Sequence, residues 1–321
     1  MTLEAAGFID HPSGFLACSP ENRQFQVAGM DGFIGYRDSM RHRIALGGVH
    51  CPADNGDRLL RAFLEDCHSH SLRALFVQVP AHQVALFEAH GATVNRLGST
   101  FVLRLDGYTL KGTPKIPLRN KIHRATRAGL AAAEVGRDCR LTAALAERIR
   151  QISSAWLRDK GGKELSFMVG VASDVHDPYR RTFAALDGAG VAQAFITYVP
   201  AWGEHPGYLH DLSRRDPHAP PGAMELINAF AIDRFQAEGV RFLHFGFTPF
   251  VMTGEEPRSA SGVMSWLTTQ LYRHGRLVYP ARSQADYKRK WGSDLVIPEY
   301  AAGFPLSLAA VVALLRLTRA L

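Results

Sequence analysis

The first third of the chain alternates short apolar runs with segments of helical spacing. Leu59, Leu60 and Phe63 recur at the spacing of one helix face, which predicts a helix over 56–70, and a similar pattern predicts one over 82–90. Runs rich in apolar residues predict strands at 32–38, 42–48, 74–79 and 99–105. This alternation predicts mixed α/β structure.

The second half of the chain repeats this order. Strands are predicted at 191–199, 208–213 and 240–247, with a helix over 224–238 that ends at Gly239. The helical segments LLRAF at 59–63 and LINAF at 226–230 resemble each other, which indicates an internal duplication. We therefore predict an α/β (α+β) chain with an N-terminal domain over 1–110, a linker helix over 111–135 and a C-terminal domain over 136–321.

A basic connector, residues 107–133, joins the two predicted halves. It contains no acidic residue and six cations, Lys111, Lys115, Arg119, Lys121, Arg124 and Arg127. At helical spacing most of these cations share one arc, and an apolar stripe through Leu118 and Ile122 lies opposite. A soluble helix usually mixes both charges, so we interpret this face as a phosphate-binding surface. An ordinary solvated helix face is the alternative.

Composition supports a globular protein with a polyanionic partner. The 321 residues are 46% hydrophobic and 21% charged, and the formal net charge is +7. The four cysteines lie far apart without zinc-ligand spacing, which favours reduced thiols in a cytoplasmic protein without a signal peptide. The longest uncharged apolar run, 301–315, is too short to span a membrane. It could lie on a membrane surface as a peripheral contact or pack on the core.

Charged residues cluster after the strand predicted at 208–213. Asp211 and Arg214 lie beside the start of the helix that carries Glu225, where α/β sheets often bind ligands. An Asp211–Arg214 salt bridge that only ties down a loop is the alternative. Further on, Lys288 and Lys290 would share one side of an extended segment, after a strand-like run at 275–279, unless both are plain surface lysines.

Several familiar catalytic signatures are missing from the sequence. It has no GxSxG elbow, HExxH motif, Walker loop or GxGxxG after a strand, and its histidines lack ligand spacing. We therefore expect neither a metal nor a nucleotide cofactor.

The motifs carry a resemblance to one family. The run LRNKIHRATRAG at 118–129 is similar to a segment of the catalytic domain of bacterial phosphatidylglycerol lysyltransferases. Further similar segments follow in the same order along nearly the whole chain, among them Asp211-Leu-Ser-Arg214, Pro221-Gly-Ala-Met-Glu225 and Tyr287-Lys-Arg-Lys-Trp291. The chain departs from the family at several positions, including Glu299, where the family commonly has arginine.

The resemblance implies two GNAT-like domains in tandem and transfer of an amino acid from aminoacyl-tRNA to a hydroxyl or amine. The implied acceptor is a phosphatidylglycerol-type head group. The same chemistry on a soluble precursor of a secondary metabolite stays open. An acyl-CoA N-acetyltransferase is a further alternative, although 215–223 lacks that family's pyrophosphate-loop pattern. A third alternative is a non-catalytic module that binds RNA or a membrane.

In the favoured reading the basic connector binds the tRNA through backbone phosphates. Asp211 is expected to bind the ammonium group of the amino acid or to orient the acceptor. Arg214, Lys288 and Lys290 are expected to bind acceptor phosphate or the developing oxyanion, and Glu225 is a candidate general base. The aminoacyl ester is already activated, so this chemistry needs no ATP.

Overall fold

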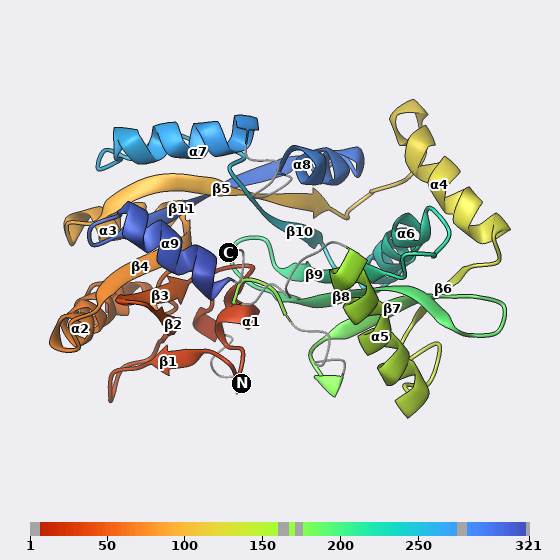
Figure 1. Ribbon diagram of the computed structural model, residues 1–321, viewed down its shortest axis with the longest axis horizontal. Coiled ribbons are helices and arrows are strands. Elements are labelled where there is room, and N and C mark those ends of the chain that lie inside the picture. The colour runs from red at the N-terminus through yellow and green to blue at the C-terminus, as the bar shows by residue number, and fades with distance from the viewer. Residues whose placement is uncertain (1–6, 160–166, 171–175, 275–280, 319–321) are drawn as a thin grey trace.

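The computed structural model describes residues 7–159, 167–170, 176–274 and 281–318. Within them an 11-stranded sheet runs through the whole molecule, with helices on both faces (Figure 1). The strand order is β1-β2-β3-β4-β11-β5-β10-β9-β8-β7-β6. Mixed α/β structure is therefore confirmed.

The elements of the first half agree with the sequence pattern. A short helix, α1 (Gly14–Ala17), precedes them. They are β1 (Arg23–Phe25), β2 (Ile34–Ser39), β3 (His42–Leu46), α2 (Gly56–Ser69), β4 (Arg73–Pro80), α3 (Val84–Ala89) and β5 (Thr93–Arg104). Short 3-10 helices η2 (Ala53–Asn55), η3 (Ala81–Gln83) and η4 (Thr113–Lys115) join them to their neighbours.

The second half begins with the connector helix α4 (Ile116–Arg127). After it come β6 (Ala131–Glu134), α5 (Ala143–Asp159), β7 (Arg181–Leu186), β8 (Ala192–Ala201), β9 (Gly207–Arg215), α6 (Ala223–Ala237) and β10 (Phe242–Pro249). The chain ends with α7 (Gly262–His274), α8 (Ala281–Lys290), β11 (Leu295–Gly303) and α9 (Leu308–Leu317). The strand-like run at 275–279 lies outside the described residues. The extended segment expected around Lys288 and Lys290 is wrong, because both residues belong to α8.

The two halves exchange their central strands. In each half two strands run parallel, β3 with β4 and β9 with β10. The last strand of the chain, β11, lies between β4 and β5 of the first half, and β5 lies between β11 and β10 of the second. If β3, β4 and β5 are matched with β9, β10 and β11, the strand order reads the same from either direction. The sheet is thus continuous across the predicted boundary at residue 110.

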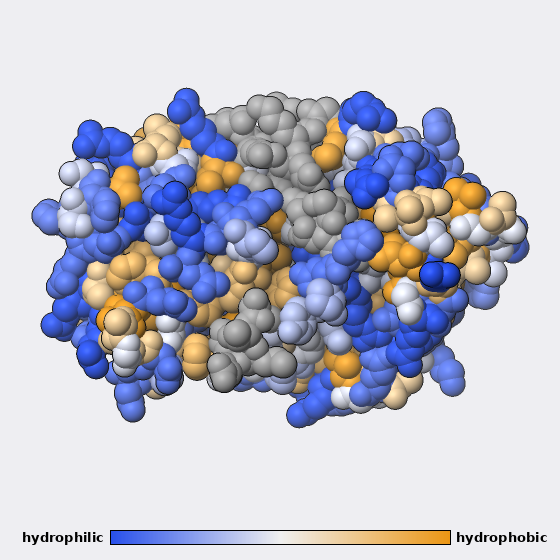
Figure 2. Space-filling model, turned by 90° about the horizontal axis from the view of Figure 1, so that it is seen from below, coloured by the Kyte–Doolittle hydropathy of each residue, from blue (hydrophilic) through white to orange (hydrophobic). Residues whose placement is uncertain are grey.

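Alternate side chains of the second half face two different cores. Phe183 and Ala185 of β7 pack with Ile227 of α6, whereas Ala184 between them packs with Ile149 of α5. Because successive strand residues point to opposite faces, α5 and α6 cover opposite faces of the sheet. Figure 2 shows the molecule from below, where hydrophilic side chains prevail and apolar ones reach the surface in patches.

The strands β9 and β10 separate soon after they pair. Their parallel register covers only Phe242–His244 with Gly207–Leu209. The register of β10 against β5 then shifts between His244 and Gly246, and Gly246 has a φ of +77°, a conformation that glycine adopts at little cost. This divergence frees backbone carbonyls of β10 to bind side chains, and it positions the candidate site described next.

Candidate active site

Lys288 occupies the point where β9 and β10 diverge. Its side chain comes from α8 and is only 6% exposed. The ammonium donates to the carbonyls of Gly246 at 2.7 Å and Phe247 at 3.0 Å, and to Thr248 Oγ1 at 2.8 Å. Burial lowers the pKa of Lys288 to about 7. A buried amine with a pKa this close to neutrality can both hold and release a proton.

Lys290 does not join Lys288 at this site. Two residues apart on a helix means side chains about 200° apart, so Lys290 of α8 is exposed to solvent. Its backbone carbonyl accepts a hydrogen bond from Lys115 Nζ at 3.2 Å, which ties η4 to the end of α8. The expected pair of adjacent ammonium groups is therefore wrong.

Titratable groups from neighbouring strands lie around Lys288. Burial, together with the nearby Lys288, lowers the pKa of His210 on β9 to about 3. Burial raises the pKa of Glu299 on β11 to about 7. No local motif marked His210 or Glu299 as partners of Lys288, because the three residues come from different elements and meet only in the folded sheet.

Glu225 joins α6 to the connector helix. It lies in the first turn of α6, is 5% exposed and accepts a hydrogen bond from Lys121 Nζ at 2.6 Å. Gly222, with a φ of +96°, permits the close approach, because a Cβ there would lie 2.0 Å from the Lys121 carbonyl oxygen. The carboxylate of Glu225 is thus engaged in an ion pair, and Lys121 is not a free phosphate ligand in this structure.

The connector helix offers fewer free cations than the sequence predicted. Arg119 donates to the carbonyl of Gly112 at 2.8 Å and to that of Leu110, so it fixes the chain before α4. Three exposed cations have no ion pair or side-chain hydrogen bond among the described residues, namely Lys111, Arg124 and Arg127. The apolar stripe is confirmed, with Leu118 and Ala125 buried. The outward cationic surface is centred on the C-terminal end of α4.

Asp211 is buried on the face of the sheet that carries α5. Its carboxylate forms an ion pair with Arg180 and accepts a hydrogen bond from the backbone N–H of Gly170 at 2.8 Å. The alternative of an Asp211–Arg214 salt bridge is wrong, because Arg214 stacks on Trp156 of α5, its guanidinium carbon 4.1 Å from the ring centroid. Asp211 therefore holds Arg180 and the 167–170 segment in place.

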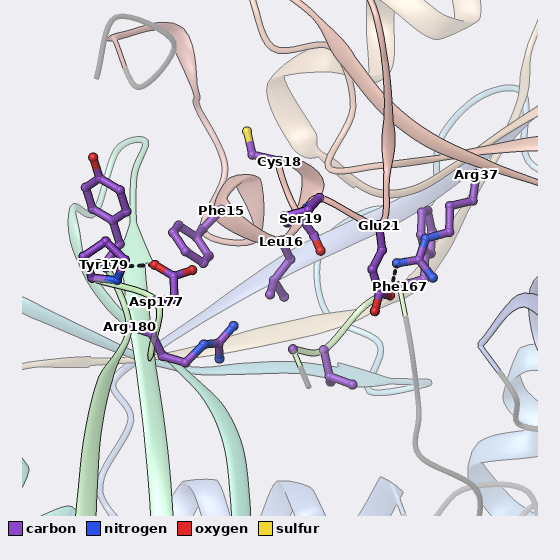
Figure 3. Close-up of a pocket in the computed structure, with 14 residues that line it drawn as sticks. Phe15, Leu16, Cys18, Ser19, Glu21, Arg37, Phe167, Asp177, Tyr179 and Arg180 are labelled. Atoms are coloured by element: carbon purple, nitrogen blue, oxygen red, sulfur yellow. Dashed lines mark hydrogen bonds and ion pairs between the residues drawn. The ribbon is translucent and has the colours of Figure 1, made fainter. Parts of the chain in front are cut away.

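A pocket of about 240 Å³ opens beside this ion pair (Figure 3). Gly170 and Arg180 line it together with aromatic rings from both halves, Phe15 from α1 and Tyr179 from the segment before β7. At its other side Arg37 of β2 pairs with Glu21 at 2.6 Å. Sequence reasoning missed this pocket because residues near 15–37 and near 167–180 share no motif, and only the fold brings them together.

Among the described residues no group of three histidine, cysteine, aspartate or glutamate side chains could hold a metal ion. None of the helices in the described ranges is both long and apolar enough to cross a membrane.

Comparisons with known proteins agree with this architecture. The family model for the C-terminal region of phosphatidylglycerol lysyltransferase matches residues 5–303. The bifunctional lysylphosphatidylglycerol biosynthesis protein LysX of Mycobacterium ulcerans is 23% identical over 276 residues, which are 83% of this chain and 24% of that protein. LysX of Mycobacterium leprae is 26% identical over 221 residues, 67% of this chain and 19% of that protein. The chain thus spans about a quarter of such relatives or less.

Solved structures share the fold. One is the C-terminal domain of a protein assigned as a lysylphosphatidylglycerol synthetase from Agrobacterium fabrum, with a TM-score of 0.78, 21% identity and coverage of 97% of this chain and 94% of that one. Another is L-PGS from Bacillus licheniformis, with a TM-score of 0.75, 21% identity and coverage of 95% and 91%. Because the family model matches almost the whole length, the chain belongs to the family of phosphatidylglycerol lysyltransferase C-terminal domains.

Proposed function

We propose that this chain transfers an amino acid from an aminoacyl-tRNA to the head group of a phosphatidylglycerol-type lipid. The observation that carries the proposal is the family match over residues 5–303. Two features support it, the buried amine of Lys288 and, on the face that carries α5, a pocket beside the Asp211–Arg180 ion pair. Transfer from an activated ester requires the protein only to hold two reactants and to move one proton.

The donor tRNA would lie along the connector helix. Arg124 and Arg127 are exposed near its C-terminal end and Lys111 lies before its start, without acidic partners among the described residues. Phosphate contacts from such cations attract any nucleic acid backbone and weaken as salt is added. Arg119 and Lys121 would support this surface through their contacts with the chain and with Glu225. Lys115 would hold it against the end of α8.

Lys288 is our candidate for the group that handles the proton. Its neutral form would accept a proton from the acceptor hydroxyl, and its charged form would stabilise the developing oxyanion. The Asp211–Arg180 pair would shape the pocket for the aminoacyl group, and Arg214 would brace the same face through Trp156. Lys290, exposed on α8, would attract a phosphate of either substrate. Glu225 would act as a general base only after it released Lys121.

The acceptor would be brought to the site by contact with an anionic membrane. α9 packs on the core through Ala310 and Ala313, while Leu308 remains 59% exposed and Val312 37% exposed. Arg316 is exposed on the next turn of the same face. An apolar face with a terminal cation suits a peripheral contact with anionic lipid. A Leu308→Asp substitution should lower the fraction of protein that sediments with phosphatidylglycerol vesicles, and unchanged sedimentation would remove α9 from the proposal.

The fold supports the finer proposal of two GNAT-like units in tandem. The order of the six central strands, β3 to β9 across the sheet, is the same in both directions, and each half supplies a central strand to the other. Duplication followed by strand exchange explains this order, and it explains the similar helices at 59–63 and 226–230. If so, the 1–110 and 136–321 regions would be the two units and α4 the linker between them.

Product analysis with purified protein tests the proposed reaction. The chain is incubated with total aminoacylated tRNA that carries labelled amino acids, with or without phosphatidylglycerol vesicles, and products are identified by mass spectrometry. We expect an aminoacylated lipid that disappears when the tRNA is first digested with ribonuclease. Label in a soluble acceptor added from cell extract, with unmodified lipid, would favour the secondary-metabolite alternative. Acetyl transfer from acetyl-CoA that resists ribonuclease would refute both.

A further inference from the structure

Glu299 is a buried carboxyl group with no role in the function proposed above. It lies on β11 and is 2% exposed. Its Oε1 atom accepts a hydrogen bond from the hydroxyl of Thr100 on β5 and lies 3.6 Å from His11 Nε2. Its Oε2 atom has no hydrogen-bond partner among the described residues. A buried carboxyl group with so few partners is costly in its charged form.

His11 does not act as the counter-ion of Glu299. Its Nδ1 atom accepts a hydrogen bond from the backbone N–H of Ser13 at 3.0 Å, so in the neutral ring the proton is on Nε2. Burial holds the pKa of His11 well below its ordinary value, and the neighbouring His50 and His244 lower it further. His11 therefore presents a neutral N–H to the carboxyl group.

Lys288 is in the complementary situation. Its three donors meet two backbone carbonyls and one hydroxyl, and no carboxylate contacts it among the residues the structure describes. It is a buried cation whose nearest partners are all neutral. Such a group needs either a counter-charge at short range or the loss of its proton.

One cross-strand pair joins the two groups. Phe247 of β10 and Thr100 of β5 are register partners. Lys288 donates to the carbonyl of Phe247 at 3.0 Å, and Thr100 donates to Glu299. Within the described ranges, the other titratable groups beside the pair are His11 near Glu299 and His210 of β9 near Lys288, and burial keeps both rings neutral near pH 7.

We propose that Glu299 and Lys288 share a single proton. The pair exists either as ammonium and carboxylate or as amine and carboxylic acid. One proton leaves Nζ and adds to a carboxyl oxygen, no other bond changes, and the net charge stays the same. Burial brings the pKa of both groups to about 7, and each group opposes that shift because it stabilises the charged form of the other.

Glu299 is thus a positioning residue that sets the charge of Lys288. If the proposed function holds, on which this consequence rests, the carboxyl group would decide how much of the enzyme carries the neutral amine that accepts a proton. Loss of the carboxylate would lower the pKa of Lys288 and move the pH profile of transfer to lower pH. The shared proton itself can be tested without any measurement of activity.

Infrared spectra of the full chain over a pH series report the protonated form of Glu299. The carboxylic-acid band is assigned by its loss in Glu299→Gln, and its titration midpoint is compared with that in Lys288→Met. We expect Lys288→Met to raise the midpoint by about one pH unit or more, because the carboxylate loses its cation. Lys290→Met, on the exposed side of the same helix, should leave the midpoint where it is.

The reciprocal measurement does not depend on whether Lys288→Met folds. Nitrogen NMR of the lysine Nζ atoms gives the pKa of Lys288 in the unmodified chain and in Glu299→Gln, which removes a charge with little change of shape. We expect that pKa to fall by about one unit or more. An unchanged Lys288 pKa in Glu299→Gln, or equal midpoints in Lys288→Met and Lys290→Met, would overturn the shared proton. Either result would leave the proposed transfer reaction intact.

Discussion

Buried neutral histidines should make the fold sensitive to acid. His50 and His244 are 1% and 0% exposed, and burial lowers the pKa of each to about 4. In the unfolded chain a histidine takes up a proton near its ordinary pKa of about 6.5. Between the two values the unfolded state binds more protons than the folded state. Stability is therefore complete above about pH 6.5 and falls as the pH drops toward 4.

His244 allows the size of this effect to be worked out. Its Nε2 atom lies 2.7 Å from the carbonyl of His205, to which the neutral ring donates. A pH of about 5 is about 1.5 units below the pKa of histidine in the unfolded chain, so that histidine is protonated, whereas His244 in the folded chain is still neutral. This difference lowers the free energy of unfolding by about 2 kcal/mol. Since domains are stable by only about 5–15 kcal/mol, a loss of this size is readily measured.

A His244→Gln substitution tests this reasoning. Glutamine keeps an N–H donor but does not titrate, so the variant should lose about 2 kcal/mol less than the unmodified chain between pH 7.5 and about 5. Free energies from urea unfolding at successive pH values give both curves. Glu299, whose raised pKa acts in the opposite direction, is common to both proteins and cancels. Replacement of the exposed His68 of α2 by glutamine is the control. If His244→Gln and the unmodified chain give parallel curves, His244 does not stay neutral in the fold.

Two further substitutions test the surface and the pocket. Replacing both Arg124 and Arg127 with alanine should weaken tRNA binding and reduce the slope of log K against log salt concentration by up to about 2. Fluorescence titration at several salt concentrations measures both quantities. The control is alanine at Arg150, an exposed arginine of α5 that pairs with Glu147, which should change neither. Asp211→Asn leaves the guanidinium of Arg180 buried beside a neutral amide, so it should lower the free energy of unfolding by about 3–5 kcal/mol. Urea titrations measure this loss, and a loss below about 1 kcal/mol would contradict a structural role for this pair.

Local pattern was sufficient for most of the secondary structure. The strands around 74–79 and 99–105 and the helices at 56–70 and 224–238 all form, because a repeated apolar face determines the element that can bury it. The segment around Lys288 is one exception. Its charged residues hide a helix whose buried face is carried by Ala281, Ala285 and Lys288 itself. A lysine on the buried face of a helix contradicts the ordinary pattern, and such exceptions occur at functional sites.

The sequence alone determined the order of the elements that it predicted, the excess of positive charge on the connector and the motifs that resemble one family. Those properties depend on neighbours within a few turns of chain, or on the count of charges, and both can be read without a fold. Only the tertiary structure decided which charges are available. It paired Asp211 with Arg180 instead of Arg214, engaged Lys121 with Glu225, and set Glu299 of the last strand near Lys288. The partner and the burial of each charged group depend on residues distant in sequence, because β5 and β11 pair only when the whole sheet forms.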